Sequence, residues 1–148
     1  MYDQPRANSS QTSTTFEQLL ERVRYEGAYP SRDRAAEAVH QVLAALGRQL
    51  TGAERVDLAQ CLPVEAALAL TASVPDNRPL TGWGFVKDLA ARTGATPATA
   101  RWDTGAVLAA VTHLTGPELL ARILHQLPDG YALLFGQAEL RRPEPAAA

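Results

Sequence analysis

The chain has 148 residues, 46% of them hydrophobic and 20% charged, and it carries a formal net charge of -2 at pH 7. This length and apolar content fit one globular domain and exclude a wholly disordered chain, and the sequence lacks the unbroken run of 18 apolar residues that would predict a membrane-spanning helix. Acidic and basic residues are spread over both halves, so the basic excess typical of nucleic-acid-binding domains is missing.

The two ends differ in composition from the middle of the chain. Residues 1–13 are rich in Ser, Thr, Gln and Asn, and residues 141–148 are small or interrupted by proline, so disordered tails are predicted at 1–13 and 137–148. Between them, apolar residues recur at helical spacing, and no stretch alternates between apolar and polar residues as a half-buried strand would. We therefore predict an all-α fold.

The first helix is predicted to begin at Thr14, because Glu17 lies three residues further on and the two side chains can form a capping box. Gly27 supplies the stop of this helix. After Pro30, Ser31 is placed to cap a second helix of about 18 residues. Apolar residues of each helix fall on one face, as expected for helices that share a core.

A third helix is predicted to begin at Thr51, where Glu54 completes a second capping box. Pro63 ends this helix and starts a short fourth one. Residues 73–82 contain two prolines and a glycine, which is the composition of a linker. The first helical repeat is therefore expected to span residues 14–72.

Beyond the linker, Gly94 is predicted to stop a fifth helix, and Thr96 to cap a long sixth helix with Pro97 in its first turn. Thr115 and Glu118 then repeat the spacing of a capping box, so a new helix is expected to begin there.

The order of these landmarks is the same in both halves of the chain. Three short segments match: VLAA at 42–45 and 107–110, LTG at 50–52 and 114–116, and LP at 62–63 and 127–128. The matched segments are 65, 64 and 65 residues apart. The sequence therefore predicts a three-to-four-helix unit that is present twice, with the second repeat at residues 83–136. Because one such unit buries little surface, we expect both to pack as one compact helical bundle.

Five segments resemble those of a known family: FEQLLERV at 16–23, YPSRDRAAEA at 29–38, VLAALGRQLTG at 42–52, DLAQCLP at 57–63 and LPDGYALLF at 127–135. Over about residues 14–136 the chain resembles the bacterial domain-of-unknown-function 2267 family, which is common in high-GC actinobacteria. The resemblance implies a duplicated helical bundle. It carries over no catalytic or ligand-binding residue.

The titratable and nucleophilic side chains form no recognisable catalytic or metal-binding motif. The three histidines, at positions 40, 113 and 125, lack the spacing of zinc ligands, and Cys61 lies toward a helix C-terminus, where the helix dipole disfavours a thiolate. We therefore expect no enzymatic activity, no metal and no cofactor. The single cysteine and the absence of an apolar signal segment favour a cytoplasmic location.

Two sets of side chains are candidates for contacts with other molecules. The aromatic set, a candidate partner or ligand contact, comprises Trp83, Trp102, Tyr131 and Phe135. The two tryptophans could instead be buried anchors between the halves. The second set, a candidate basic patch, comprises Arg22, Arg24, Arg32 and Arg34. Acidic residues are interleaved with these arginines, so we expect local ion pairs there.

We predict a non-catalytic interaction module that binds an unidentified protein, or a second copy of itself, through its C-terminal half. Residues 106–135 carry only three charged side chains, so this half has little polar surface for its helices. One alternative is a bundle that binds a small apolar ligand near Trp83 and Trp102. Another is weak nucleic-acid binding through the arginines at 22–34. We do not expect a membrane partner, and nucleic acid is the less favoured partner.

Overall fold

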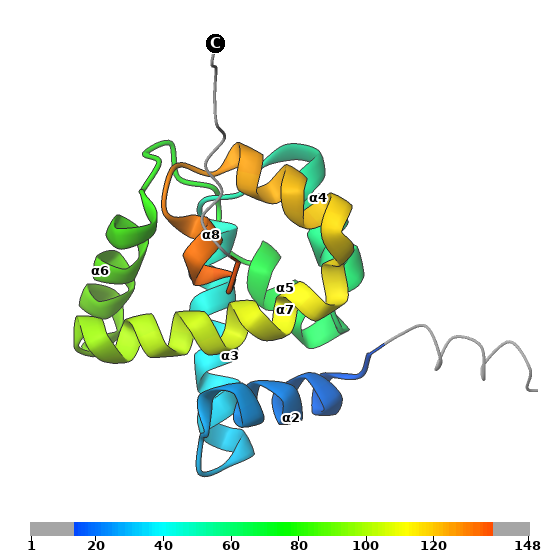
Figure 1. Ribbon diagram of the computed structural model, residues 1–148, viewed down its shortest axis with the longest axis vertical. Coiled ribbons are helices and arrows are strands. Elements are labelled where there is room, and N and C mark those ends of the chain that lie inside the picture. Colours follow the sequence, from blue (N-terminus) through cyan, green and yellow to red (C-terminus); the bar gives the residue numbers. More distant parts are fainter. Residues whose placement is uncertain (1–13, 138–148) are drawn as a thin grey trace, which may run out of the picture.

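The computed structural model describes residues 14–137, and within this range every regular element is a helix (Figure 1). The helices are α2 (Phe16–Gly27), α3 (Arg32–Gly47), α4 (Gly52–Cys61), α5 (Val64–Thr71), α6 (Gly82–Thr93), α7 (Pro97–Gln126) and α8 (Tyr131–Leu134). The predicted all-α fold is confirmed. The predicted tails lie outside the described residues, apart from Gln137.

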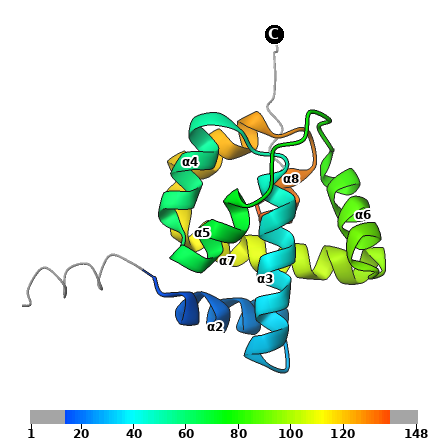
Figure 2. The same cartoon turned by 180° about the vertical axis from the view of Figure 1, so that it is seen from behind.

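The long helix α7 organises the bundle. It packs against α2, α3, α4, α6 and α8, and it runs across the molecule in Figure 1. Seen from behind in Figure 2, α3 passes in front of α7 with α5 beside it. Side chains from all these helices form one continuous apolar core. By length and composition α7 would also suffice to cross a membrane, but the core helix of a bundle meets the same test.

The start of α2 corrects the predicted capping box by one residue. Thr15, not Thr14, is the N-cap: its hydroxyl accepts a hydrogen bond from the Gln18 amide at 3.1 Å, and the Gln18 side chain accepts one from the Thr15 amide at 2.9 Å. Glu17 is drawn instead into an ion pair with Arg32. A glutamine at the third helical position serves the box as well as a glutamate.

The second predicted capping box does not form. Thr51 precedes α4, but its side chain makes no capping hydrogen bond. Gln126 of α7 caps this end of α4 instead. Its side-chain oxygen accepts a hydrogen bond from the Thr51 amide at 2.8 Å, and its side-chain nitrogen donates one to the Glu54 carboxylate at 2.9 Å. A tertiary contact has therefore replaced the local one.

The third predicted helix start appears as a break inside α7. Gly116 has φ 78° and ψ 162°, a conformation that is essentially confined to glycine, and Pro117 follows it. The Thr115 hydroxyl donates to the Thr112 carbonyl at 3.3 Å and does not cap the next turn. The chain therefore breaks its helix at the predicted place, but without the predicted box. The break divides α7 into an N-terminal segment, residues 97–115, and a C-terminal segment, residues 117–126.

The matched landmarks of the two halves share backbone conformations. Gly52 and Gly116, the glycines of the two LTG segments, have φ values of 67° and 78°. Leu62 and Leu127, the leucines of the two LP segments, both have a ψ of 152°. The helices α2 and α6, which come first in each half, both contain 12 residues. That the halves are a duplicated unit stays a prediction.

The helices α3 and α5 touch backbone to backbone at one glycine. A Cβ atom on Gly47 would lie 1.9 Å from the carbonyl oxygen of Leu70, which is far inside van der Waals contact. Any larger residue at this position would have to push the two helices apart.

We therefore expect Gly47→Ala to lower the free energy of unfolding by about 1–3 kcal/mol, because the added methyl group overpacks the contact. Helix propensity alone would favour alanine, so the contact decides the sign of the effect. Gly105→Ala is the matched control, since its Cβ would meet only the end of the flexible Arg101 side chain. Urea unfolding followed by circular dichroism measures both variants. Equal stabilisation by the two substitutions would contradict the expectation.

Candidate binding groove

Two of the four aromatic candidates are core residues. Tyr131 and Phe135 are each 1% exposed. The Tyr131 ring meets Phe85 edge to face with 5.6 Å between ring centroids, and its hydroxyl donates to the Leu80 carbonyl at 2.9 Å. The prediction that Phe135 contacts a partner is therefore corrected, because its side chain is occupied inside the bundle. Tyr131 is equally buried, but it also lines the groove described below, so its contact with a partner stays a prediction.

The two tryptophans lie at the surface. Trp83 is 59% exposed and Trp102 is 58% exposed, so the idea that they are buried anchors between the halves is wrong. The indole N–H of Trp102 donates to the Gly27 carbonyl at 2.8 Å, which fixes its ring against the end of α2. Neither ring lines the groove described below.

Each arginine of the predicted basic patch is held in an ion pair, as expected from the interleaved acids. Their shortest ion-pair distances to carboxylates are Arg22–Glu26 3.3 Å, Arg24–Glu21 3.6 Å, Arg32–Glu21 2.6 Å and Arg34–Asp103 3.0 Å. The hydrogen bond from Arg32 is the main reason why the pKa of Glu21 lies below its usual value. This surface is therefore a mixed-charge network at the turn between α2 and α3.

A buried polar cluster that the sequence analysis missed joins this turn to α7. Asp103 is 4% exposed and accepts hydrogen bonds from the Tyr29 hydroxyl at 2.6 Å and from the Arg34 guanidinium at 3.0 and 3.2 Å. The guanidinium carbon lies 5.0 Å from the centre of the Tyr29 ring. Because Arg34 and Tyr29 donate to the same buried carboxylate across 69 and 74 residues, the cluster is a structural clamp. No local motif marks it in the sequence.

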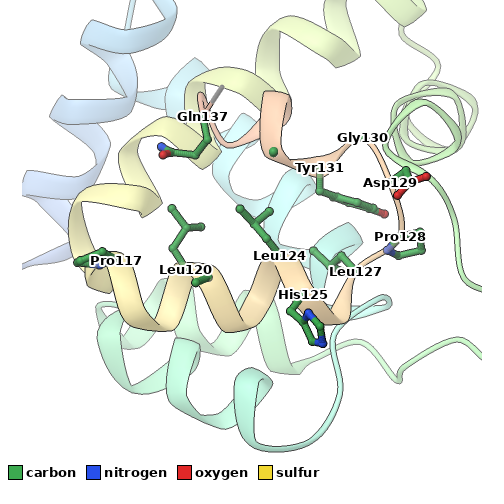
Figure 3. A pocket seen from close by; sticks show the side chains of 12 residues that line it. Pro117, Leu120, Leu124, His125, Leu127, Pro128, Asp129, Gly130, Tyr131 and Gln137 are labelled. Carbon is green, nitrogen blue, oxygen red and sulfur yellow. The ribbon is translucent and has the colours of Figure 1, made fainter. Parts of the chain in front are cut away.

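An open groove lies between the C-terminal segment of α7 and α8 (Figure 3). Its volume is about 520 Å³. Leu120 and Leu124 point from α7 toward Gln137 and Tyr131, and Leu127 continues the same wall. We call this the α7–α8 groove.

The lining of the α7–α8 groove is apolar along the helix and polar at its edges. Leu120, Leu124 and Leu127 follow the i, i+4, i+7 spacing of one helix face. His125, Asp129 and Gln137 supply the polar edge. Among residues 14–137, no three His, Cys, Asp or Glu side chains gather as metal ligands would. The groove can therefore offer apolar contact with hydrogen bonds at its margin.

Fold and site together define a class: an all-helical bundle with an open groove of mixed polar and apolar lining in its C-terminal half. The chain belongs to the family described as an uncharacterized conserved protein, DUF2267, whose model matches residues 16–134. The resemblance seen in the sequence is thereby confirmed. No curated protein matches the chain.

Proposed function

We propose that this domain is a non-catalytic interaction module whose α7–α8 groove holds an apolar helical segment of a partner protein. The observation that carries the proposal is the groove wall around Leu124, which is half-buried and stands between Leu120 and Leu127, themselves 6% and 7% exposed. A row of side chains one helical turn apart is the surface that the apolar face of a second helix fits. The groove lies in the C-terminal half, where the sequence is poorest in charge.

The shape of the groove favours a protein segment over a small molecule. Pockets for small ligands enclose most of the ligand surface, whereas the α7–α8 groove is an open one. Its volume of about 520 Å³ is sufficient for several aliphatic side chains presented by a helix. A small apolar ligand and a second copy of the chain are the competing occupants, and the test below separates them.

We expect Ala121→Trp to abolish partner binding, because Ala121 is exposed, lines the α7–α8 groove and leaves room for an indole that would fill it. Ala91→Trp is the matched control, since Ala91 is an exposed helical alanine on α6, outside the groove. Each variant is expressed at native level in the source cells and purified by affinity, and the co-purifying proteins are identified by mass spectrometry. A protein that is retained by Ala91→Trp and lost with Ala121→Trp is the expected result.

Three results would contradict the proposal. Partners retained equally by both variants would place binding elsewhere. Native mass spectrometry that shows a small added mass, lost in Ala121→Trp, would make the groove a ligand pocket. Light scattering that shows a dimer sensitive to the same substitution would make the occupant a second copy.

A further inference from the structure

The part of the chain that the structure describes ends on the wall of the α7–α8 groove. Gly136 has a φ of 79°, which turns the backbone after α8. The Gln137 amide then donates a hydrogen bond to the Ala132 carbonyl at 2.9 Å, and both residues line the groove. In Figure 3, Leu120 and Leu124 point toward Gln137. The residues that follow Gln137 therefore start beside the apolar wall of the groove.

The far end of the α7–α8 groove carries a carboxylate. Asp129 lies beyond Leu127 in Figure 3, its side chain is exposed, and it makes no ion pair within residues 14–137. The other titratable groups of the lining are His125, which is also exposed, and Tyr131, whose pKa is raised by burial. The groove thus leads from an apolar middle to a carboxylate at one end.

Residues 138–148, with the sequence AELRRPEPAAA, carry complementary groups in the same order. Leu140 is the one large apolar residue of this segment, and two arginines follow it. The proline at position 143 favours an extended backbone at Arg142. In an extended chain alternate residues share a side, so Leu140 and Arg142 are expected on one side and Arg141 on the other.

The length of the segment matches the length of the groove. The groove wall follows α7 from Pro117 to Leu127, which is about 15 Å at the helical rise of about 1.5 Å per residue. Five extended residues, 138–142, span up to about 17 Å. Leu140 can therefore reach the middle of the wall and Arg142 its far end.

We propose that residues 138–142 lie along the α7–α8 groove and block it, with the Leu140 side chain against Leu124 and the Arg142 guanidinium at the Asp129 carboxylate. A composition that predicts a disordered tail suits a segment that orders only against such a surface. A partner helix has to displace this segment before it can bind, so the groove is autoinhibited. That consequence rests on the proposed function, whereas the contact itself does not.

The first test is NMR of the isotope-labelled full-length chain. We expect nuclear Overhauser contacts between the methyl groups of Leu140 and those of Leu124. Leu140→Asp is expected to remove these contacts and to shift the amide resonances of residues 120–132. Ala147→Asp is the matched control, because it makes the same change of charge in the same segment, beyond the reach of the groove, and is expected to leave both unchanged.

A charge exchange tests the polar end of the contact. Arg142→Glu is expected to weaken the contacts of Leu140, and combining it with Asp129→Lys is expected to restore them, because the pair then has its charges reversed. Arg141→Glu is the matched control, since the alternation places Arg141 on the other side of the segment. An equal effect of Arg141→Glu and Arg142→Glu would show that the arginines act only through net charge.

Competition measures how far the segment blocks the groove. The probe is a synthetic peptide, AELRRPEPAAA, with both ends blocked. It is expected to bind Leu140→Asp at the vacated groove and to bind the unaltered chain about tenfold more weakly, because the chain's own segment competes for the same surface. Ala121→Trp, which fills the groove, is expected to abolish binding of the peptide and the contacts of Leu140 alike.

Four results would overturn the proposal: absent contacts between Leu140 and Leu124, equal effects of Leu140→Asp and Ala147→Asp, equal effects of Arg141→Glu and Arg142→Glu, and equal binding of the peptide to the unaltered chain and to Leu140→Asp. Contacts seen only between differently labelled chains would also overturn it, because the occupant would then be a second copy. Partner capture is scored separately. A partner lost with Ala121→Trp while Leu140 makes no contact would sustain the proposed function and refute this inference. A contact of Leu140 without any captured partner would sustain the contact and refute the proposed function.

Discussion

Replacing Arg55 by alanine is expected to lower the free energy of unfolding by about 3–5 kcal/mol, which is several times the effect of a typical surface substitution. The reason is the number of carbonyl groups that this one guanidinium serves. It donates to the carbonyls of Gly47 and of Leu50, the latter at 3.2 Å, near the end of α3. It also donates to carbonyls near the end of α5, at 3.3 Å to Thr71 and 2.6 Å to Ser73.

The loss of stability in Arg55→Ala arises at the C-terminal ends of α3 and α5 together. The last carbonyls of a helix have no partner within the helix and carry the negative end of its dipole. Arg55 is half-buried, so water cannot fully replace it when the side chain is removed. Arg55→Lys is expected to recover only part of the loss, because an ammonium group cannot present the planar fork that reaches both helix ends.

Guanidinium chloride unfolding measures the effect, with Arg92→Ala as control. Arg92 is an exposed arginine whose single ion pair, to Asp88 at 2.8 Å on the same helix, is expected to contribute less than about 0.5 kcal/mol. A loss below about 1 kcal/mol for Arg55→Ala would show that water satisfies the carbonyls and that the bridge between α3 and α5 is dispensable.

The contacts of Arg55 also show which features of the fold could not be predicted from the sequence. Helix starts and stops at Ser31, Gly94 and Thr96 were predictable, because caps and glycine stops are local signals. The capping box expected at Thr51 failed, because Gln126, 75 residues away, occupies the site. No local sequence pattern predicts that an arginine will donate hydrogen bonds to the carbonyls of two other helices.

The candidate sites follow the same division. The sequence indicated an apolar C-terminal half, and a groove with a row of leucines lies there. It could not separate the aromatic residues that fill the core, such as Tyr131, from those left at the surface, such as Trp83, since both types suit either environment.

Replacing Asp103 by alanine is expected to lower the free energy of unfolding by about 3–4 kcal/mol, because it leaves the Tyr29 hydroxyl and the Arg34 guanidinium without their common acceptor. Tyr29→Phe, which removes one hydrogen bond from the same cluster, is expected to cost about 1 kcal/mol. In the double variant the second substitution is expected to cost less than it does alone, because its partner is already gone. Strict additivity in urea unfolding would contradict the idea that the three residues form one clamp.

The clamp also predicts how stability depends on alkaline pH. Burial, and then the hydrogen bond to Asp103, raise the pKa of Tyr29 above its ordinary value of 10.0, so the folded chain keeps a proton that the unfolded chain releases. The stabilisation is fully present below pH 10, and stability falls as pH rises above that value. Burial raises the pKa of Tyr131 in the same direction. Tyr29→Phe should therefore make the fall in the urea midpoint between pH 9 and pH 11 shallower. An unaltered slope in Tyr29→Phe would mean that the hydroxyl is not held by Asp103 in solution.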